Sequence, residues 1–264
     1  MTAAQRVLKS YARREESNMD RTPSGITNLD KLIEGGFPKG RSILIAGGAG
    51  SGKTIFSLQF LYSGAVLYDE PGIYVSFEQP VDEVARDAQR FGWDIPDMTA
   101  SKKLAFLDYS QARSKTSDVV IETPNFNLDP LIKAIQFTAK EVGAKRIVLD
   151  SITALLLQFK STDTVRRELQ RVSSSLKKLG CTTLLTSEVP RGSVGFGRFG
   201  VEEFVVDGVI ILQVIQKGLL RFRCIEITKM RGTKAELGLR AIGITESGIT
   251  VYPEKVYTIE QLGI

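Results

Sequence analysis

One eight-residue stretch, residues 47–54, limits the folds open to this chain more than any other, because it has the pattern G-x-x-x-x-G-K-T. It follows the apolar run 43–45 and opens the apolar, helix-like segment 55–67. Glycines tolerate the positive φ and the close approach that let several backbone N–H groups surround one anion. The pattern therefore predicts a phosphate-binding loop between a strand and a helix whose positive dipole end faces the phosphates.

The last two residues of this stretch carry side chains suited to a bound nucleotide. Lys53 adds a cation near the β- and γ-phosphates, and Thr54 offers a hydroxyl to Mg²⁺. The alternative is a Gly/Ser-rich turn that matches by chance, but the strand before it, the helix after it and an acid-tipped strand downstream favour the loop. The residues that we expect at the nucleotide from this stretch are Gly48, Ala49, Gly50, Ser51, Gly52, Lys53, Thr54 and Ile55.

The length of the chain fits one large domain with short tails. With 264 residues it is long enough for a substantial α/β core and too short for two typical domains with linkers. We expect a tail or short amphipathic helix over 1–20, the domain over 21–255 and a tail over 256–264. The formal charge of +5 is spread along the chain, so it need not imply a polyanionic partner.

Rare and absent residue types exclude several kinds of chemistry. The sequence has no histidine, which excludes histidine catalysis and histidine metal ligands. Cys181 and Cys224 lie in apolar, strand-like segments without metal-ligand spacing, so we expect reduced core residues. With no apolar run of 18 residues and no secretory leader, we expect a cytoplasmic protein without a membrane segment. The chemistry must then rest on carboxylates, lysine and arginine.

Strand-like and helix-like segments alternate along most of the chain, and strands dominate its last third. The expected helices are 55–67, 80–91, 129–142 and 163–179, and the expected strands are 42–46, 73–77, 104–107, 146–150, 182–186, 209–212, 222–227 and 249–252. This order predicts an α/β fold with a mostly parallel central sheet flanked by helices and antiparallel strands at one edge. Ligands of such folds bind at the carboxyl ends of the strands.

Two carboxylates follow predicted strands at the edge where the phosphate-binding loop also lies. Asp150 ends the strand 146–150, in the pattern of an acid that holds Mg²⁺ through water and the loop threonine, Thr54. The alternative for Asp150 is a cap of the next segment, 151–153. Glu78 ends the neighbouring strand, where a carboxylate can orient or deprotonate a water in line with the γ-phosphate. The alternative for Glu78 is a solvated acid at a strand end.

Five segments together resemble the KaiC-like family of RecA-type P-loop ATPases. They are the phosphate-binding loop, Ser76-Phe77-Glu78, Leu149-Asp150-Ser151, Gly200-Val201-Glu202-Glu203-Phe204 and Lys229-Met230-Arg231-Gly232-Thr233. The resemblance covers about residues 21–253 and is closest to the first, ATP-hydrolysing half of the cyanobacterial clock protein, here as a single copy. It implies a RecA-like domain that forms rings, usually hexamers, with ATP and Mg²⁺ held between subunits.

The resemblance also implies roles for individual residues. Glu78 would be the catalytic acid, beside the Lys53 and Thr54 that bind the phosphates and Mg²⁺. Lys229 and Arg231 would reach the γ-phosphate bound by the neighbouring subunit and stabilise charge there. A surface ion pair is the alternative for Arg231. The further nucleotide contacts that the resemblance implies are Met230, Thr233, Thr245 and Glu246.

This chain departs from the family pattern in three places. It has Glu78-Gln79 where the family often has two adjacent acids, and an amide cannot take a proton from water, which leaves Glu78 as the primary acid. It has Glu246 where Asp is commoner. Residues 201–204 offer no hydroxyl where the phosphorylating half of the family has adjacent Ser and Thr, so we expect water to be the phosphoryl acceptor.

Three functions are compatible with the sequence. The favoured one is a ring-forming ATPase that acts as a conformational or regulatory switch on a protein partner. The second is a recombinase-like ATPase that binds single-stranded DNA through the loop 189–200, which contains Arg191, Arg198, Phe196 and Phe199. Two arginines are a small electrostatic footprint, so a flexible loop or a subunit contact is favoured for this segment. The third is an ATP-gated scaffold or autokinase with little turnover, against which an intact Glu78 argues.

Overall fold

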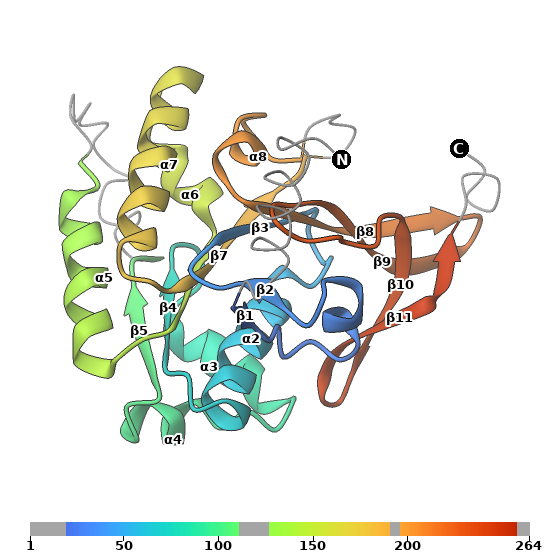
Figure 1. Cartoon of the computed structure of the whole chain (residues 1–264), viewed down its shortest axis with the longest axis horizontal. Coiled ribbons are helices and arrows are strands. Elements are labelled where there is room, and N and C mark those ends of the chain that lie inside the picture. Colours follow the sequence, from blue (N-terminus) through green and yellow to red (C-terminus); the bar gives the residue numbers. More distant parts are fainter. Residues whose placement is uncertain (1–19, 111–126, 191–195, 258–264) are drawn as a thin grey trace, which may run out of the picture.

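The computed structural model describes residues 20–110, 127–190 and 196–257 (Figure 1). Its strands are β1 (Arg21–Thr22), β2 (Phe37–Pro38), β3 (Ser42–Gly47), β4 (Gly72–Ser76), β5 (Leu104–Asp108), β6 (Arg146–Asp150), β7 (Thr182–Glu188), β8 (Gly208–Lys217), β9 (Leu220–Met230), β10 (Leu239–Thr245) and β11 (Gly248–Tyr257). Its helices are the 3-10 helix η1 (Leu29–Leu32) and the α-helices α2 (Lys53–Leu67), α3 (Val81–Gln89), α4 (Ile95–Ala100), α5 (Asp129–Val142), α6 (Ile152–Leu156), α7 (Thr162–Lys177) and α8 (Glu202–Val205).

Nine of the described strands form one sheet in the order β11-β10-β9-β8-β3-β7-β6-β4-β5. The strands from β8 to β5 in this order pair in parallel. Strands β9, β10 and β11 continue the sheet from β8 in antiparallel pairs. The predicted α/β fold, with a mostly parallel sheet and an antiparallel edge, is confirmed.

Strand β3 lies inside the sheet, and its side chains alternate between two hydrophobic layers. Ile43 and Ile45 pack in the layer that contains α2, α3 and α4, whereas Leu44 and Ala46 pack in the layer that contains α5, α6 and α7. Figure 1 shows these two groups of helices on opposite sides of the sheet. A parallel strand that is covered on both faces has no solvent side, which is why the run 43–46 is apolar throughout. The phosphate-binding loop therefore starts from a rigid, fully buried strand.

The predicted helices and strands lie close to their observed positions, and α5 has the predicted bounds, 129–142. Strand β10 was missed because Arg240 and Gly243 interrupt its apolar residues, and only its pairing with β9 and β11 keeps it extended. The helices α4, α6 and α8 were missed because each is too short to show a helical period. Parts of the expected tails, residues 1–19 and 258–264, lie outside the described residues, as do residues 111–126 and residues 191–195 of the expected loop 189–200.

Helix α2 packs closely on β6 through a buried arginine. The Arg146 side chain is 0% exposed, and its guanidinium lies 4.6 Å from the ring centroid of Phe60. Its Nε donates to a Glu70 carboxylate oxygen at 2.7 Å, and a second nitrogen donates to the Phe60 carbonyl oxygen at 2.7 Å. A Cβ at Gly64 would lie 2.3 Å from the Arg146 Nε. Only glycine at this position of α2 leaves room for the guanidinium.

The substitution Gly64→Ala should therefore lower the free energy of unfolding by about 1–3 kcal/mol, the usual cost of an extra carbon in a filled site. Urea denaturation followed by circular dichroism measures this change. Val66→Ala, at an exposed position of the same helix, is the matched control and should change stability by no more than about 0.5 kcal/mol. Equal stability of Gly64→Ala and the control would contradict the packing described for Arg146.

The two cysteines are core residues, as predicted. Both Cys181 and Cys224 are buried free thiols, and burial raises the pKa of each to about 11. Neither thiol therefore contributes a thiolate at neutral pH. In the described part of the chain, no helix combines the length and the apolar character needed to cross a bilayer.

Candidate nucleotide site at the end of strand β3

The phosphate-binding loop leaves the first turn of α2 open to an anion. Gly52 is the N-cap residue of α2, has φ 106° and provides no side-chain cap. The first N–H groups of a helix have no partners within the helix, so an uncapped start suits a phosphate. At Gly47, a Cβ would lie 2.3 Å from the carbonyl oxygen of Leu212, so the packing of β3 on β8 requires glycine there. Strand and loop geometry thus both support the predicted phosphate-binding loop.

Lys53 is held over this loop by the loop's own backbone. Its Nζ donates to the carbonyl oxygens of Gly47, at 2.9 Å, and Gly48, at 3.1 Å. Burial lowers the pKa of Lys53, and three nearby carboxylates oppose that shift. They belong to Glu188, Asp150 and Glu78. A partly desolvated ammonium interacts more strongly with a phosphate than an exposed one does, which suits Lys53 to the predicted contact.

Asp150 ends β6 with its carboxylate fixed by three hydroxyl donors. Thr54 Oγ1 donates to Asp150 Oδ2 at 2.9 Å, as the predicted pairing of loop and acid requires. Tyr74 donates to the same oxygen at 2.5 Å, and Thr186 donates to Oδ1 at 2.5 Å. Burial and the charge of Asp150 raise the pKa of Tyr74 well above its usual value, which keeps the phenol protonated as a donor. The alternative role of Asp150 as a helix cap is taken by Ser151, which caps α6.

The arrangement of Thr54 and Asp150 fits a magnesium ion that is bound together with a nucleotide. Among the described residues, no group of three or more Asp, Glu, Cys or His side chains could hold a metal alone. Mg²⁺ commonly takes one or two protein ligands and completes its shell with phosphate oxygens and water. One carboxylate and one adjacent hydroxyl at the mouth of a phosphate-binding loop are the donors that this mode of binding uses.

Glu78 follows β4 and lies beside the same loop. Its Oε1 accepts a hydrogen bond from Ser151 Oγ at 2.5 Å, and Ser151 directly follows Asp150. A second carboxylate, Glu188, comes from the end of β7, where it is paired in register with Gly47. Glu188 was not predicted because the expected strand ended at 186, two residues early. Glu78 and Glu188 are thus the two acids next to Lys53 that are not tied to the Thr54 hydroxyl.

The antiparallel strands β9 to β11 also bring residues to the loop. Arg223 of β9 donates from Nε to the Gly50 carbonyl oxygen at 3.1 Å. Thr245 ends β10 and Glu246 begins the turn to β11, and a Cβ at Gly52 would lie 3.5 Å from Ile249, just after that turn. The turn therefore lies beside the start of α2 of the same chain. Arg223 was not predicted, because only the register of β9 on β8 brings it to the loop.

Lys229 and Arg231 lie at the opposite edge of the sheet from the loop. Lys229 pairs with Val209 near the start of β8, and β8 runs parallel to β3. The loop follows the end of β3, and a strand of this length spans about 17–20 Å. Neither cation can cover that distance to a phosphate in its own loop.

Three other predicted residues offer less to a nucleotide than expected. The side chain of Met230 is buried in the core against Gly208, so it is not exposed to a ligand. Ser51 is 1% exposed, its side chain is turned toward Gly47, and its N–H donates to the Gly48 carbonyl oxygen at 3.3 Å. Thr233 lies with Lys229 and Arg231 at the opposite edge, where its Oγ1 accepts a hydrogen bond from Arg21 at 2.5 Å.

The loop 189–200 offers less for DNA than its sequence suggested. Phe199 is partly buried against the hydrophobic layer of α5 to α7, and its N–H donates to Glu202 at 3.2 Å. Phe196 is 39% exposed. Arg191 lies outside the described residues. Because Phe199 packs into the fold, the proposed stacking of bases on two phenyl rings loses one ring.

Comparison with known families gives a match to the family model for the KaiC ATPase over residues 22–256. The chain belongs to the KaiC family of ATPases. The match includes the loop, the three acids next to it and the distant pair Lys229 and Arg231. The resemblance inferred from the sequence motifs is therefore confirmed.

Individual KaiC relatives agree with this assignment. The circadian clock oscillator protein KaiC of Synechococcus elongatus is 40% identical over 228 residues, which are 86% of this chain and 43% of that protein. KaiC of Acaryochloris marina is 37% identical over 248 residues, 93% of this chain and 47% of that protein. The chain thus spans less than half the length of these relatives. A solved KaiC-like protein from Pyrococcus horikoshii OT3 aligns with a TM-score of 0.78 and 36% identity, over 89% of this chain and 100% of that one.

Proposed function

We propose that this chain is a Mg²⁺-dependent ATPase that assembles head to tail in a ring, usually a hexamer, with ATP bound between subunits. The observation that carries this proposal is the separation of two sets of residues on one sheet. Lys53, Thr54 and Glu78 lie at one edge, here called the loop edge. Lys229 and Arg231 lie at the other, here called the far edge. Each set is half of a phosphoryl-transfer site, because the reaction needs cations on the γ-phosphate as well as the loop. Two copies in contact would complete one site.

Each residue at the loop edge would have a separate role in ATP hydrolysis. Mg²⁺, held by Thr54 and Asp150, would neutralise charge on the phosphates. Glu78 would orient the attacking water and accept its proton, and Ser151 holds Glu78 in place through its 2.5 Å hydrogen bond. Arg231 of the next subunit would stabilise charge on the transferred group. Turnover would then drive a conformational or regulatory switch on a protein partner, in the cytoplasm, where buried free thiols such as Cys181 persist.

The direct test measures phosphate release from ATP by the full chain, with Mg²⁺ and with excess EDTA. Native mass spectrometry with and without ATP gives the assembly state in the same buffers. We expect Mg²⁺-dependent release together with a nucleotide-dependent closed ring. Ring formation without phosphate release would instead support the scaffold function, and stimulation of release by single-stranded DNA would support the recombinase-like function.

Lys53→Ala should weaken ATP binding by about 10- to 100-fold, because it removes the charge-assisted donor of a loop that otherwise binds phosphate through backbone dipoles. Titration of a fluorescent ATP analogue measures this change. Lys39→Ala, which breaks an exposed ion pair with Asp20, is the control and should bind like the wild type. Unchanged affinity of Lys53→Ala would reject the assignment of the loop.

Incubation with γ-labelled ATP should release labelled phosphate and leave little label on the protein. Glu202, Glu203 and Phe204 form α8 together with Val205, so α8 offers no hydroxyl acceptor beside the trans cations. Gel autoradiography and phosphate counting on the same sample compare the two products. Stoichiometric label on any Ser or Thr would identify the chain as an autokinase and contradict this expectation.

A further inference from the structure

A buried carboxylate lies directly behind the cations of the far edge. The side chain of Asp207 is 1% exposed and lies between the end of α8 and the start of β8. Its Oδ2 accepts the backbone N–H of Ser42 at 3.1 Å, and its own N–H donates to the Ser42 carbonyl oxygen at 2.8 Å. Two hydrogen bonds to the first residue of β3 fix Asp207 against the central strand of the sheet.

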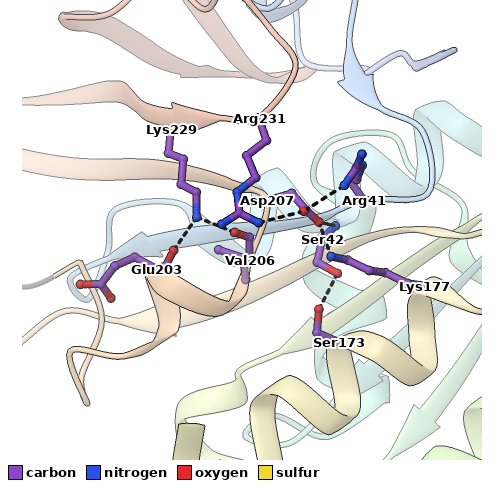
Figure 2. A network of polar contacts seen from close by, with 9 residues as sticks. All are labelled: Arg41, Ser42, Ser173, Lys177, Glu203, Val206, Asp207, Lys229 and Arg231. Carbon is purple, nitrogen blue, oxygen red and sulfur yellow. Dashed lines mark hydrogen bonds and ion pairs between the residues drawn. The ribbon is translucent and has the colours of Figure 1, made fainter. Parts of the chain in front are cut away.

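Three cations from separate parts of the chain converge on this carboxylate, as Figure 2 shows. Lys177, at the end of α7, places its Nζ 2.7 Å from Oδ2. Arg41 and Arg231 approach Oδ1 at 3.3 and 3.8 Å. Burial raises the pKa of Asp207, but hydrogen bonds from Lys177 and Ser42 and the charges of Lys177 and Arg41 outweigh it and hold the pKa below its usual value. The carboxylate is therefore ionised at neutral pH.

Arg231 is attached to Asp207 at two points. Besides the ion pair, its backbone N–H donates to the Asp207 carbonyl oxygen at 3.0 Å. The Arg231 side chain remains 57% exposed, and it lines a polar pocket of about 230 Å³ together with Lys177 and Phe204. Arg231 is thus oriented from behind by Asp207 while its outer face stays open to a partner group.

The cations that surround Arg231 make the negative charge of Asp207 necessary for holding it in place. Lys177, Arg41 and Lys229 all lie near Arg231, and like charges at such distances repel. Lys229 has its own anchor, since its Nζ donates to the carbonyl oxygens of Glu203 at 2.8 Å and Val206 at 2.6 Å. Those carbonyls belong to the segment that ends at Asp207. Without the carboxylate, the remaining cations would push the Arg231 guanidinium away from its position.

We propose that Asp207 is the positioning residue for Arg231, which it orients toward the phosphate of the adjoining subunit. Asp207 lies against the start of β3, so it is not expected to touch a nucleotide held by the loop of its own chain. This inference rests on the proposed function, in which Arg231 acts on a neighbouring site. It adds a specific claim, that the loss of Asp207 damages the next site in the ring and leaves its own site intact.

The test uses Asp207→Asn, which keeps the size of the side chain and removes its charge. At saturating ATP, turnover should fall by about 10- to 100-fold, the cost of a catalytic group that is misplaced rather than removed. ATP affinity and the melting temperature of the ring are measured in parallel, and affinity should not change. Asp129→Asn, which breaks an exposed ion pair with Arg171 on α7, is the matched control and should turn over ATP like the wild type.

Mixed rings decide whether Asp207 acts through the neighbour. Asp207→Asn is mixed with Glu78→Gln, which has an intact far edge but an inactive loop edge. In well-mixed rings about one site in four joins an intact loop edge to an intact far edge, so turnover should recover to that extent. A parallel mixture of Arg231→Ala with Glu78→Gln shows whether far-edge residues act in trans at all. If Asp207→Asn does not fold, the charge-balanced double variant Asp207→Asn/Lys177→Met replaces it.

The outcomes separate this inference from the proposed function. Recovery in both mixtures supports the positioning role of Asp207. Recovery with Arg231→Ala but not with Asp207→Asn shows that Asp207 only stabilises its own subunit and overturns the inference. Recovery in neither mixture rejects the trans site itself, and with it the role proposed for Asp207. Wild-type turnover by Asp207→Asn alone also overturns it.

Discussion

Arg231→Ala should reduce ATP turnover by about 10³- to 10⁵-fold, the range found when a cation on the transferred phosphoryl group is lost in other phosphoryl-transfer enzymes. Binding of ATP to an isolated subunit should not change, because Arg231 lies at the edge opposite the loop. Phosphate release at saturating ATP and titration with a fluorescent analogue measure the two quantities.

Two matched variants make the Arg231 result specific. Arg166→Ala removes an arginine that lines the same pocket but lies on α7, and it should cost far less turnover. Arg231→Lys keeps the charge without the planar guanidinium and should recover only part of the activity. If Arg166→Ala and Arg231→Ala lost turnover equally, general surface charge rather than a positioned group would explain the effect.

Glu78→Gln should retain ATP binding and lose about 10²- to 10⁴-fold in turnover, because an amide has the size of the carboxylate but cannot accept a proton from water. Single-turnover measurement of phosphate release separates this loss from a change in product release. The Ser151 hydroxyl can still reach the amide oxygen, so the side chain should keep its position.

Glu188 provides the control for Glu78, because both acids lie near Lys53 and follow strands of the sheet. Glu188→Gln should turn over ATP within about tenfold of the wild type if Glu78 is the general base. A larger loss in Glu188→Gln than in Glu78→Gln would move the base from the end of β4 to the end of β7. The pair of variants therefore assigns the base whichever way the result falls.

Local motifs were enough to predict part of this site. The loop with Lys53 and Thr54, and Asp150 at the end of an apolar run, are contiguous patterns whose chemistry follows from neighbouring residues. Alternating strands and helices then indicated one sheet, so that the loop, Asp150 and Glu78 were expected at the same edge. The 2.9 Å hydrogen bond between Thr54 and Asp150 agrees with that expectation.

The residues that were missed are brought to the site by the register of strand pairing. Strand register cannot be predicted from a local sequence pattern. Tyr74 and Thr186 lie in the strands on either side of β6, and only cross-strand pairing brings them to Asp150. In the sequence, Asp207 is a polar residue before an apolar strand, and the role proposed for it depends on cations from three distant parts of the chain. The sequence alone therefore predicts site residues that belong to motifs better than the residues that hold their side chains in place.

In the proposed ring, each catalytic site is divided between two subunits, and this division has a consequence for stoichiometry. A single copy holds a loop without its cations and cations without their loop, and an open chain of copies always has one incomplete site at each end. Only closure makes the number of working sites equal to the number of subunits. Specific activity should accordingly rise with protein concentration until rings are complete, so dilution alone would act as an inhibitor.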